Sequence, residues 1–139
     1  MTTSVPEIRA IAAEQTYPLR HAVLWPEKPF DYVKVENDGE GQHFGAFLDQ
    51  QLVSVISLFV DDEQARFRKF ATDPKFQRQG IGSVLLQRVI DEARRLGARS
   101  LWCDARQDAT AFYQRFDMRA EGAVFYKGDI PYQRMRLAL

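Results

Sequence analysis

At its centre the sequence reads Lys69-Phe70-Ala71-Thr72-Asp73-Pro74-Lys75-Phe76-Gln77-Arg78-Gln79-Gly80-Ile81-Gly82-Ser83: a strand pattern, a loop with two glycines, and the start of a helix pattern. The first turn of a helix leaves backbone N–H groups without internal partners, and the helix dipole adds positive charge there. Glycines let an anion approach the backbone, and Arg78 adds a fixed charge. The stretch predicts a phosphate site, although a tight turn that merely needs glycine would look the same.

Two better-known phosphate loops do not fit this stretch. A Walker-type loop ends in Gly-Lys-Ser/Thr, whereas Gly82 is followed by Ser83 and Val84. A dinucleotide-binding fingerprint needs a third glycine where this chain has Leu85, and it follows a first strand rather than an antiparallel meander. An unrelated nucleotide-phosphate binder stays open as an alternative.

The segments around the loop predict a mixed sheet. Three strand-like runs with short joins precede it, as in an antiparallel meander: His43–Leu48, Gln51–Val60 and Ala65–Thr72. Apolar residues spaced by three to five predict an amphipathic helix from Ile81 to Leu96, which Gly97 stops before a strand at Ser100–Cys103. Strand, helix and strand form a crossover, so one strand pair is parallel. We therefore expect an α/β fold with a mixed, largely antiparallel sheet and flanking helices.

The two ends of the chain add further elements to one domain, residues 1–139. The sequence predicts a strand at Val5–Ala12 and a short helix at Glu14–Leu24 with Pro18 in its first turn. A second helix is expected at Ala109–Phe116, and strands from Val124 onward close with Met135–Leu139. A length of 139 residues fits a single domain.

Composition limits the function classes. Lys plus Arg and Asp plus Glu each total 19, so the strongly basic field typical of nucleic-acid binding is absent. Cys103 is the single cysteine and cannot form an internal disulfide, and it is expected to be buried and inert. Residues Met1–Ala10 lack a signal-peptide pattern, and no window is apolar enough to span a bilayer. We expect a cytoplasmic protein without a nucleic-acid or membrane partner and without a metal site, because its two histidines and one cysteine lie far apart in sequence.

The central loop resembles a known family. Gln77-x-x-Gly80-x-Gly82 is similar to the Q/R-x-x-G-x-G/A signature of the GCN5-related N-acetyltransferases (GNAT). Phe70–Pro74 looks like the end of that family's fourth strand, and Ala109–Tyr113 looks like its later A-x-x-F/L-Y helix. The resemblance covers about half of the chain. The C-terminal run from Gly128 to Met135 is similar to the bacterial ElaA-type branch, which often has histidine at the position of Tyr132.

The resemblance implies an acetyl-CoA-dependent N-acyltransferase. Its cosubstrate's pyrophosphate would bind at the loop, whose residues are Gln77, Arg78, Gln79, Gly80, Ile81, Gly82 and Ser83. The fourth strand at Phe70, Ala71 and Thr72 would pair its backbone with the pantetheine arm, and an N–H near Phe70 would face the acetyl oxygen. The fourth and fifth strands would splay between Thr72 and Ser100 to admit that arm. Dimers are frequent in the family, so a homodimer is a further expectation.

The implied reaction is direct attack of an amine on the thioester, without a covalent acyl-enzyme. Tyr113 is the candidate proton donor to the leaving thiolate, since a tyrosine hydroxyl has an unperturbed pKa near 10; a purely packing role is the alternative. The base stays open among Asp61, Asp62, Glu63, Glu36 and His43, although the acidic triplet fits a solvated turn and His43, like His21, fits an ordinary surface or capped histidine.

The acceptor amine is not identified by the sequence. Arg68 and Lys69 occupy adjacent strand positions, so we expect them on opposite faces, with one of them able to favour an anionic acceptor group. Four aromatic residues can line an acceptor pocket or simply pack: Trp25, Phe30, Tyr32 and Tyr132.

Two positions depart from the family pattern. Arg106 replaces the usual asparagine and can reach towards a cofactor phosphate, and Asp117-Met118 replaces Gly-Phe. Asp tolerates the left-handed conformation that this turn needs. A coenzyme A-binding module without catalytic activity is the alternative function.

Overall fold

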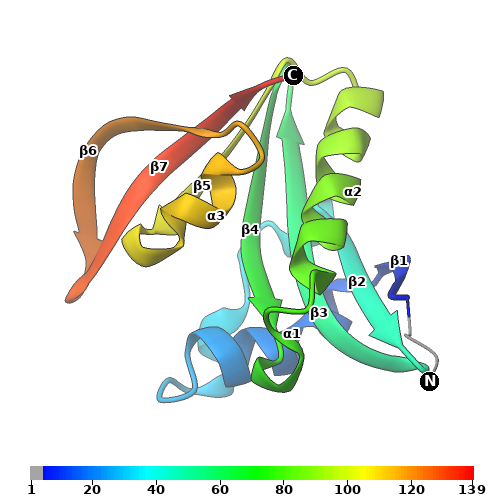
Figure 1. Ribbon diagram of the computed structural model, residues 1–139. Coiled ribbons are helices and arrows are strands. Elements are labelled where there is room, and N and C mark those ends of the chain that lie inside the picture. The colour runs from blue at the N-terminus through cyan, green and yellow to red at the C-terminus, as the bar shows by residue number, and fades with distance from the viewer. Residues whose placement is uncertain (1–4) are drawn as a thin grey trace.

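A computed structural model describes residues 5–139, and the first four residues of the stretch Met1–Ala10 lie outside the described part. Seven strands form one sheet in the order β1-β2-β3-β4-β5-β7-β6 (Figure 1). The strands are β1 Glu7–Ile11, β2 Gln42–Leu48, β3 Gln51–Asp61, β4 Gln64–Thr72, β5 Ser100–Arg106, β6 Arg119–Lys127 and β7 Ile130–Ala138. The helices are α1 Ala13–Leu19, α2 Ile81–Arg95 and α3 Thr110–Gln114; a π-helix spans Arg20–Leu24, and short 3-10 turns span Phe30–Val33, Asp38–Glu40, Pro74–Phe76 and Gln107–Ala109.

The sheet is mixed, as predicted. β1 to β4 form an antiparallel meander, and β5, β7 and β6 pair antiparallel with one another. The β4–β5 pair is parallel because α2 connects the two strands as a crossover. The parallel pair therefore joins two antiparallel halves of the sheet, and the candidate site lies at this junction.

Helices cover opposite faces of the sheet at β3. Ile56 and Leu58 belong to the core cluster that also contains Leu85 and Val89 of α2. Ser57 points the other way, because strand side chains alternate, and it accepts a hydrogen bond from Arg20 of the π-helix. The crossover helix and the N-terminal helical segment thus lie on the two sides of this strand.

The N-terminal helix differs from the prediction. Pro18 lies in the last turn of α1 rather than in its first turn, and the chain continues as a π-helix to Leu24. Proline cannot donate the intrahelical hydrogen bond at its position, so the regular α-helix is interrupted near it. The predicted helical span Glu14–Leu24 is otherwise confirmed.

The turn after α3 takes the expected conformation. Asp117 has a φ of 66° in the left-handed region, and the next residue, Met118, is buried in the core. This turn reverses the chain into β6, which begins at Arg119 and not at Val124. No helix in residues 5–139 is long and apolar enough to cross a membrane.

Candidate active site

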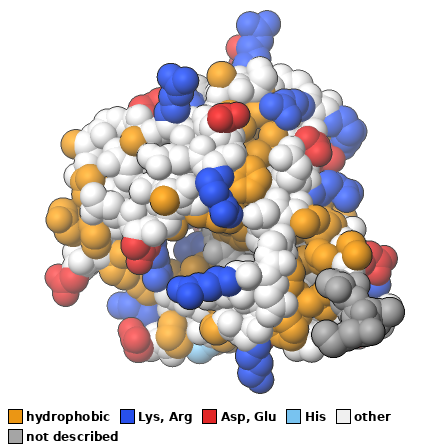
Figure 2. All heavy atoms as spheres, viewed as in Figure 1, with side chains coloured by type: hydrophobic (Ala, Val, Ile, Leu, Met, Phe, Trp, Pro, Cys, Tyr) orange, Lys and Arg blue, Asp and Glu red, His pale blue; other side chains and the backbone are white. Residues whose placement is uncertain are grey.

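A cavity opens where β4 and β5 separate. The two strands pair only from Gln64 to Arg66 and from Ser100 to Trp102, and they diverge beyond this point. The predicted splay is confirmed, but Ser100 lies at its paired end and not in the gap. A cavity of about 650 Å³ fills the opening, and Figure 2 shows the surface hollowed in this region with basic side chains around the hollow.

Five parts of the chain line this cavity. The end of the π-helix and the segment after it contribute Leu24, Trp25, Tyr32 and Lys34–Asn37. β4 contributes Arg66–Phe70, and β5 contributes Cys103–Arg106. Asp108, Ala109 and Tyr113 come from the α3 region, and Lys127 and Tyr132 come from the last two strands. Trp25, Tyr32 and Tyr132 are therefore in the predicted aromatic lining, whereas Phe30 packs against Tyr17 and His21 instead.

A β-bulge in β4 overturns one prediction. Lys69 has a φ of 55°, and the register with β3 shifts between Val55 and Ser57. The bulge inserts an extra residue, so Arg68 and Lys69 both line the cavity instead of facing opposite sides. Phe67 and Phe70, on either side of them, pack with the core.

The loop between β4 and α2 presents free backbone N–H groups. In the described part of the chain, none of the amides from Arg78 to Ser83 donates to a backbone carbonyl, and α2 has no side-chain cap. Gly80 has a φ of 82°, so an L side chain would be strained there. A Cβ atom on Gly82 would lie 3.3 Å from the Phe70 ring, so glycine at this position avoids a tight contact between the start of α2 and β4. These features fit a diphosphate.

Two glutamines of the loop stabilise its shape. Gln77 Nε2 donates to the Thr72 carbonyl at 3.0 Å, and Gln79 Nε2 donates to the Lys75 carbonyl at 3.3 Å. Arg78 is exposed and has a φ of 63°. The loop residues lie at the end of β4 and do not line the cavity itself (Figure 1). A ligand that reaches from the loop to the cavity must therefore follow the free edge of β4.

The edge of β4 that faces the gap carries unpaired backbone groups. Asp73 N–H donates to the Val53 carbonyl of β3 at 2.8 Å. Because successive strand residues direct their backbone groups to opposite edges, Thr72 presents its N–H and carbonyl to the gap. The carbonyl already accepts the hydrogen bond from Gln77 Nε2, so the N–H is the group left for a ligand. Ala71, the residue before Thr72, pairs with Val55 of β3.

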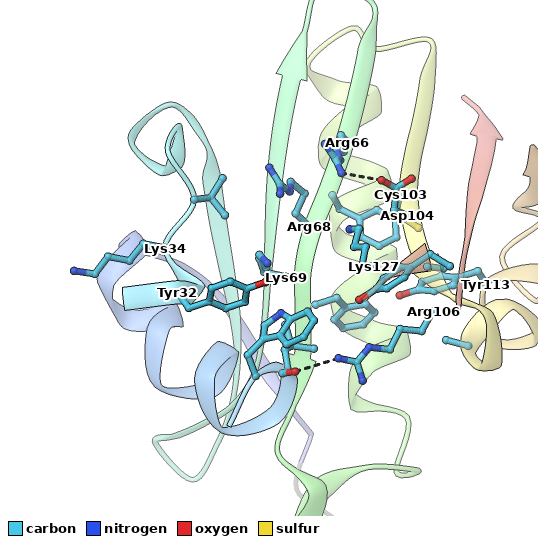
Figure 3. Close-up of a pocket in the computed structure, with 18 of the residues that line it drawn as sticks. Tyr32, Lys34, Arg66, Arg68, Lys69, Cys103, Asp104, Arg106, Tyr113 and Lys127 are labelled. Carbon is cyan, nitrogen blue, oxygen red and sulfur yellow. Dashed lines mark hydrogen bonds and ion pairs between the residues drawn. The ribbon is translucent and has the colours of Figure 1, made fainter. Parts of the chain in front are cut away.

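Tyr113 of α3 is buried and also reaches the cavity. Its ring contacts Phe67 and Phe112, with centroid distances of 5.6 Å and 5.2 Å. Figure 3 shows its hydroxyl directed into the cavity. Burial raises the pKa of Tyr113 above its ordinary value, and the neighbouring Cys103 adds to the effect. The hydroxyl is therefore protonated at neutral pH, as a proton donor requires.

Cys103 is buried, as predicted, and lines the same cavity. Burial raises its pKa, and Asp104 raises it further. The thiol is the unreactive protonated form, which fits a reaction without a cysteine nucleophile.

The candidate bases are mostly remote. Asp61 and Asp62 lie with Glu63 in the exposed turn between β3 and β4, outside the cavity lining. His43 is not a surface residue: it is buried, with hydrogen bonds to Ser57 Oγ at 2.7 Å and to the Asp38 carbonyl at 2.9 Å. Glu36 is the member of the predicted set that lines the cavity.

Arg106 has a role that the sequence did not indicate. Its guanidinium donates to the Leu24 carbonyl at 3.1 Å and lies 5.7 Å from the centroid of the Trp25 ring. It thereby ties β5 to the end of the π-helix across the cavity (Figure 3). Its reach towards a cofactor phosphate stays a prediction.

A buried ion pair supports the segment that contributes Tyr32 and Lys34–Asn37 to the cavity. Arg20 is fully buried and contacts both carboxylate oxygens of Asp38 at 2.8 Å and 2.9 Å, and it also donates to the Val33 carbonyl and Ser57 Oγ. Burial alone would raise the pKa of Asp38, but hydrogen bonds from Arg20 and the Val35 N–H outweigh it and lower that pKa. Sequence reasoning missed this pair, since no local pattern links residues 18 positions apart.

The partly buried charge on Lys69 is expected to lower the free energy of unfolding. Burial, then the nearby Arg68 and Lys127, lowers its pKa from 10.5 to about 8. Below pH 8 the folded state therefore holds a disfavoured charge, and this penalty disappears as the pH rises towards 10.5. Lys69→Met should raise the free energy of unfolding by about 1 kcal/mol at pH 7, a value reduced for the partial exposure of Lys69.

Urea unfolding at pH 7 and pH 10 measures this effect. The gain should shrink at pH 10, and the exposed control Lys75→Met should change little at either pH. An equal gain at both values would mean that the ammonium charge of Lys69 is not the cause.

This arrangement defines a class of protein: a transferase in which a loop with free backbone amides leads along a split parallel strand pair to a cavity. Residues 5–118 match the Acetyltransferase (GNAT) family, and the chain belongs to this family. It is similar to an uncharacterized N-acetyltransferase, YitI, of Bacillus subtilis, with 30% identity over 90% of this chain and 88% of the relative. It is also 36% identical to the [Ribosomal protein bS18]-alanine N-acetyltransferase of Escherichia coli, over 66% of this chain and 60% of that protein.

Solved structures share the fold. Escherichia coli ElaA matches with a TM-score of 0.82 and 17% identity over 95% of this chain and 99% of that chain. A GNAT family acetyltransferase from Elizabethkingia anophelis with acetyl-CoA bound matches with a TM-score of 0.76 and 20% identity over 96% of this chain and 98% of that chain. The predicted GNAT-type fold is confirmed, and the protein is an acetyl-CoA-dependent N-acetyltransferase of this family. Within residues 5–139 no group of three or more His, Cys, Asp or Glu side chains is placed to hold a metal.

Proposed function

We propose that the protein transfers the acetyl group of acetyl-CoA to a primary amine by direct attack, with both substrates bound at once. The observation that carries this proposal is one continuous path: free amides at the start of α2, the open edge of β4, and the cavity with Tyr113. Holding amine and thioester together supplies much of the rate enhancement in such a mechanism. A homodimer and a cytoplasmic location stay predictions from the sequence.

The loop would hold the pyrophosphate. The N–H groups from Arg78 to Ser83 are free to donate, and the dipole of α2 favours negative charge at the same end. Arg78 can pair with phosphate oxygens from the exposed side. Gln77 and Gln79 contribute by keeping the loop in shape rather than through their own free groups.

The open edge of β4 would hold the pantetheine arm and the acetyl group. Thr72 presents backbone groups to the gap, and strand alternation directs the Phe70 N–H to the same edge, next to the bulge. An N–H fixed at this point can donate to the acetyl oxygen as negative charge develops on it, which lowers the barrier to attack.

Tyr113 would protonate the leaving thiolate. Its hydroxyl points into the cavity and stays protonated, and within residues 5–139 it has no hydrogen-bond partner that would occupy its proton. Its ring is fixed by Phe67 and Phe112, so the donor is held in place before the reaction.

The activity is tested by incubating the protein with acetyl-CoA and a broad panel of primary amines. We expect amine-dependent release of the coenzyme A thiol, together with an acetylated amine detected by mass spectrometry. Binding of acetyl-CoA without consumption in any mixture would instead favour a silent coenzyme A-binding module. Equal competition by ATP would favour a general nucleotide-phosphate binder.

Gly82→Leu should weaken the binding of coenzyme A at least about tenfold, which corresponds to roughly 1.4 kcal/mol. A side chain here meets the Phe70 ring and covers the amides at the start of α2. Isothermal titration with coenzyme A measures the change. The control Val84→Leu, at an exposed position of the same helix, should keep wild-type affinity. Unchanged affinity in a folded Gly82→Leu protein would remove the loop from the binding site.

A further inference from the structure

We propose that the acceptor amine carries a carboxylate, and that Arg68, with Lys69 and Lys127 beside it, binds this carboxylate. The inference rests on the proposed function and names the substrate class of the same site. It follows from the charges that face the cavity, not from any relative. Acceptors of this class are amino acids and similar small amino-carboxylates.

The cavity has an excess of positive charge. Six basic side chains line it against three acidic ones. One of the acidic groups, Asp104, is already engaged by two arginines, Arg66 and Arg134, each at 3.1 Å. The other two, Glu36 and Asp108, belong to exposed residues, where water and salt screen their charge.

Among the described residues, four of the basic lining groups lack a carboxylate partner. One of them, Arg106, donates to the Leu24 carbonyl instead, which leaves Arg68, Lys69 and Lys127. In the described part of the chain, Arg68 makes no side-chain hydrogen bond or ion pair, and Lys69 and Lys127 make no ion pair. Arg68 and Lys69 are half-buried, and Lys127 lies 4.4 Å from the centroid of the Tyr132 ring. Figure 3 shows all three side chains around the same opening.

Positive charges around the cavity act on both lysines. Burial and then Arg68 and Lys127 lower the pKa of Lys69. Burial also lowers the pKa of Lys127; Asp104 opposes this, whereas Arg66 and Arg68 add to it. An anion among them would relieve this repulsion, and a planar guanidinium such as that of Arg68 suits a carboxylate.

The bulge in β4 is what creates this arrangement. A regular strand would send Lys69 to the core face, but the left-handed residue keeps it beside Arg68. The same cavity contains the Tyr113 hydroxyl, so an acceptor held at Arg68 lies in the compartment where the thioester would be attacked. A polyamine or a lysine-rich peptide would be repelled here.

Matched acceptors with and without the carboxylate test the inference. Glycine, β-alanine, 4-aminobutyrate and L-phenylalanine are each compared with their amides, for binding to the coenzyme A complex and for acetylation. We expect the acids to bind about tenfold or more tightly than the amides in at least one pair, and to show a similar advantage in kcat/KM. Arg68→Gln should abolish this advantage, and Arg68→Lys should retain part of it.

The control Arg94→Gln removes an arginine from the exposed face of α2, outside the cavity, and should keep the wild-type preference. Acids and amides that bind equally, with no effect of Arg68→Gln, would overturn the inference even if amines are acetylated. Conversely, selective binding of the acids without any consumption of acetyl-CoA would support the carboxylate site and contradict the proposed transfer.

Discussion

Tyr113→Phe is expected to lower kcat by about a hundredfold or more while the Kd for coenzyme A stays within about twofold. The substitution removes only the hydroxyl that points into the cavity. The ring contacts with Phe67 and Phe112 remain, so the fold should be retained. Steady-state kinetics with acetyl-CoA and an active amine, together with isothermal titration, measure the two quantities separately.

A matched substitution controls for the loss of a tyrosine hydroxyl. Tyr126 of β6 is 66% exposed and is not part of the cavity lining, so Tyr126→Phe should leave kcat unchanged. If Tyr113→Phe turns over at the wild-type rate, Tyr113 is a packing residue and another group protonates the thiolate.

Arg20→Met is expected to lower the free energy of unfolding by about 3–5 kcal/mol, because it leaves the Asp38 carboxylate buried without its partner. The pair also hydrogen-bonds to β3 and the loop, through Ser57 and Val33. Urea unfolding at pH 7 measures the change. Asp38→Asn should be destabilising for the same reason.

An ion pair with an exposed arginine on α2 provides the comparison. Arg95 contacts Glu92 at the surface, and Arg95→Met should change stability by less than about 1 kcal/mol. The pH dependence has a defined sign: the folded-state pKa of Asp38 lies below its ordinary value of 3.8, so the contribution is present above that pH and is lost as the pH falls below it. A change below 1 kcal/mol for Arg20→Met would show that the pair does not support the fold.

The sequence predicted those parts of the fold that local patterns specify. The period of apolar residues located α2 to within one residue at its C-terminal end, and Gly97 adopts the left-handed conformation expected of a helix stop. Turn residues located the hairpin between β2 and β3. The parallel β4–β5 pair followed from the strand–helix–strand order, because crossover connections have one preferred hand.

In the candidate site, the sequence predicted only the residues that belong to short local motifs. The glycine loop and Tyr113 come from short motifs; the loop leads into α2 after β4, and Tyr113 lines the cavity. The partners of the buried Arg20 are set by tertiary packing, and a bulge shifts side chains by one residue without a sequence signal. For this reason the shared face of Arg68 and Lys69, which determines the charge of the cavity, was missed.

The central claim is that free amides at the start of α2 bind the pyrophosphate of coenzyme A. The most direct measurement is a titration of the isotope-labelled protein with coenzyme A, followed by amide NMR. We predict large, saturable shifts of the Gly80 and Gly82 amide signals, with little change at Gly97, an exposed glycine beyond the opposite end of α2. Binding of coenzyme A that leaves the Gly80 and Gly82 signals unchanged would contradict the claim.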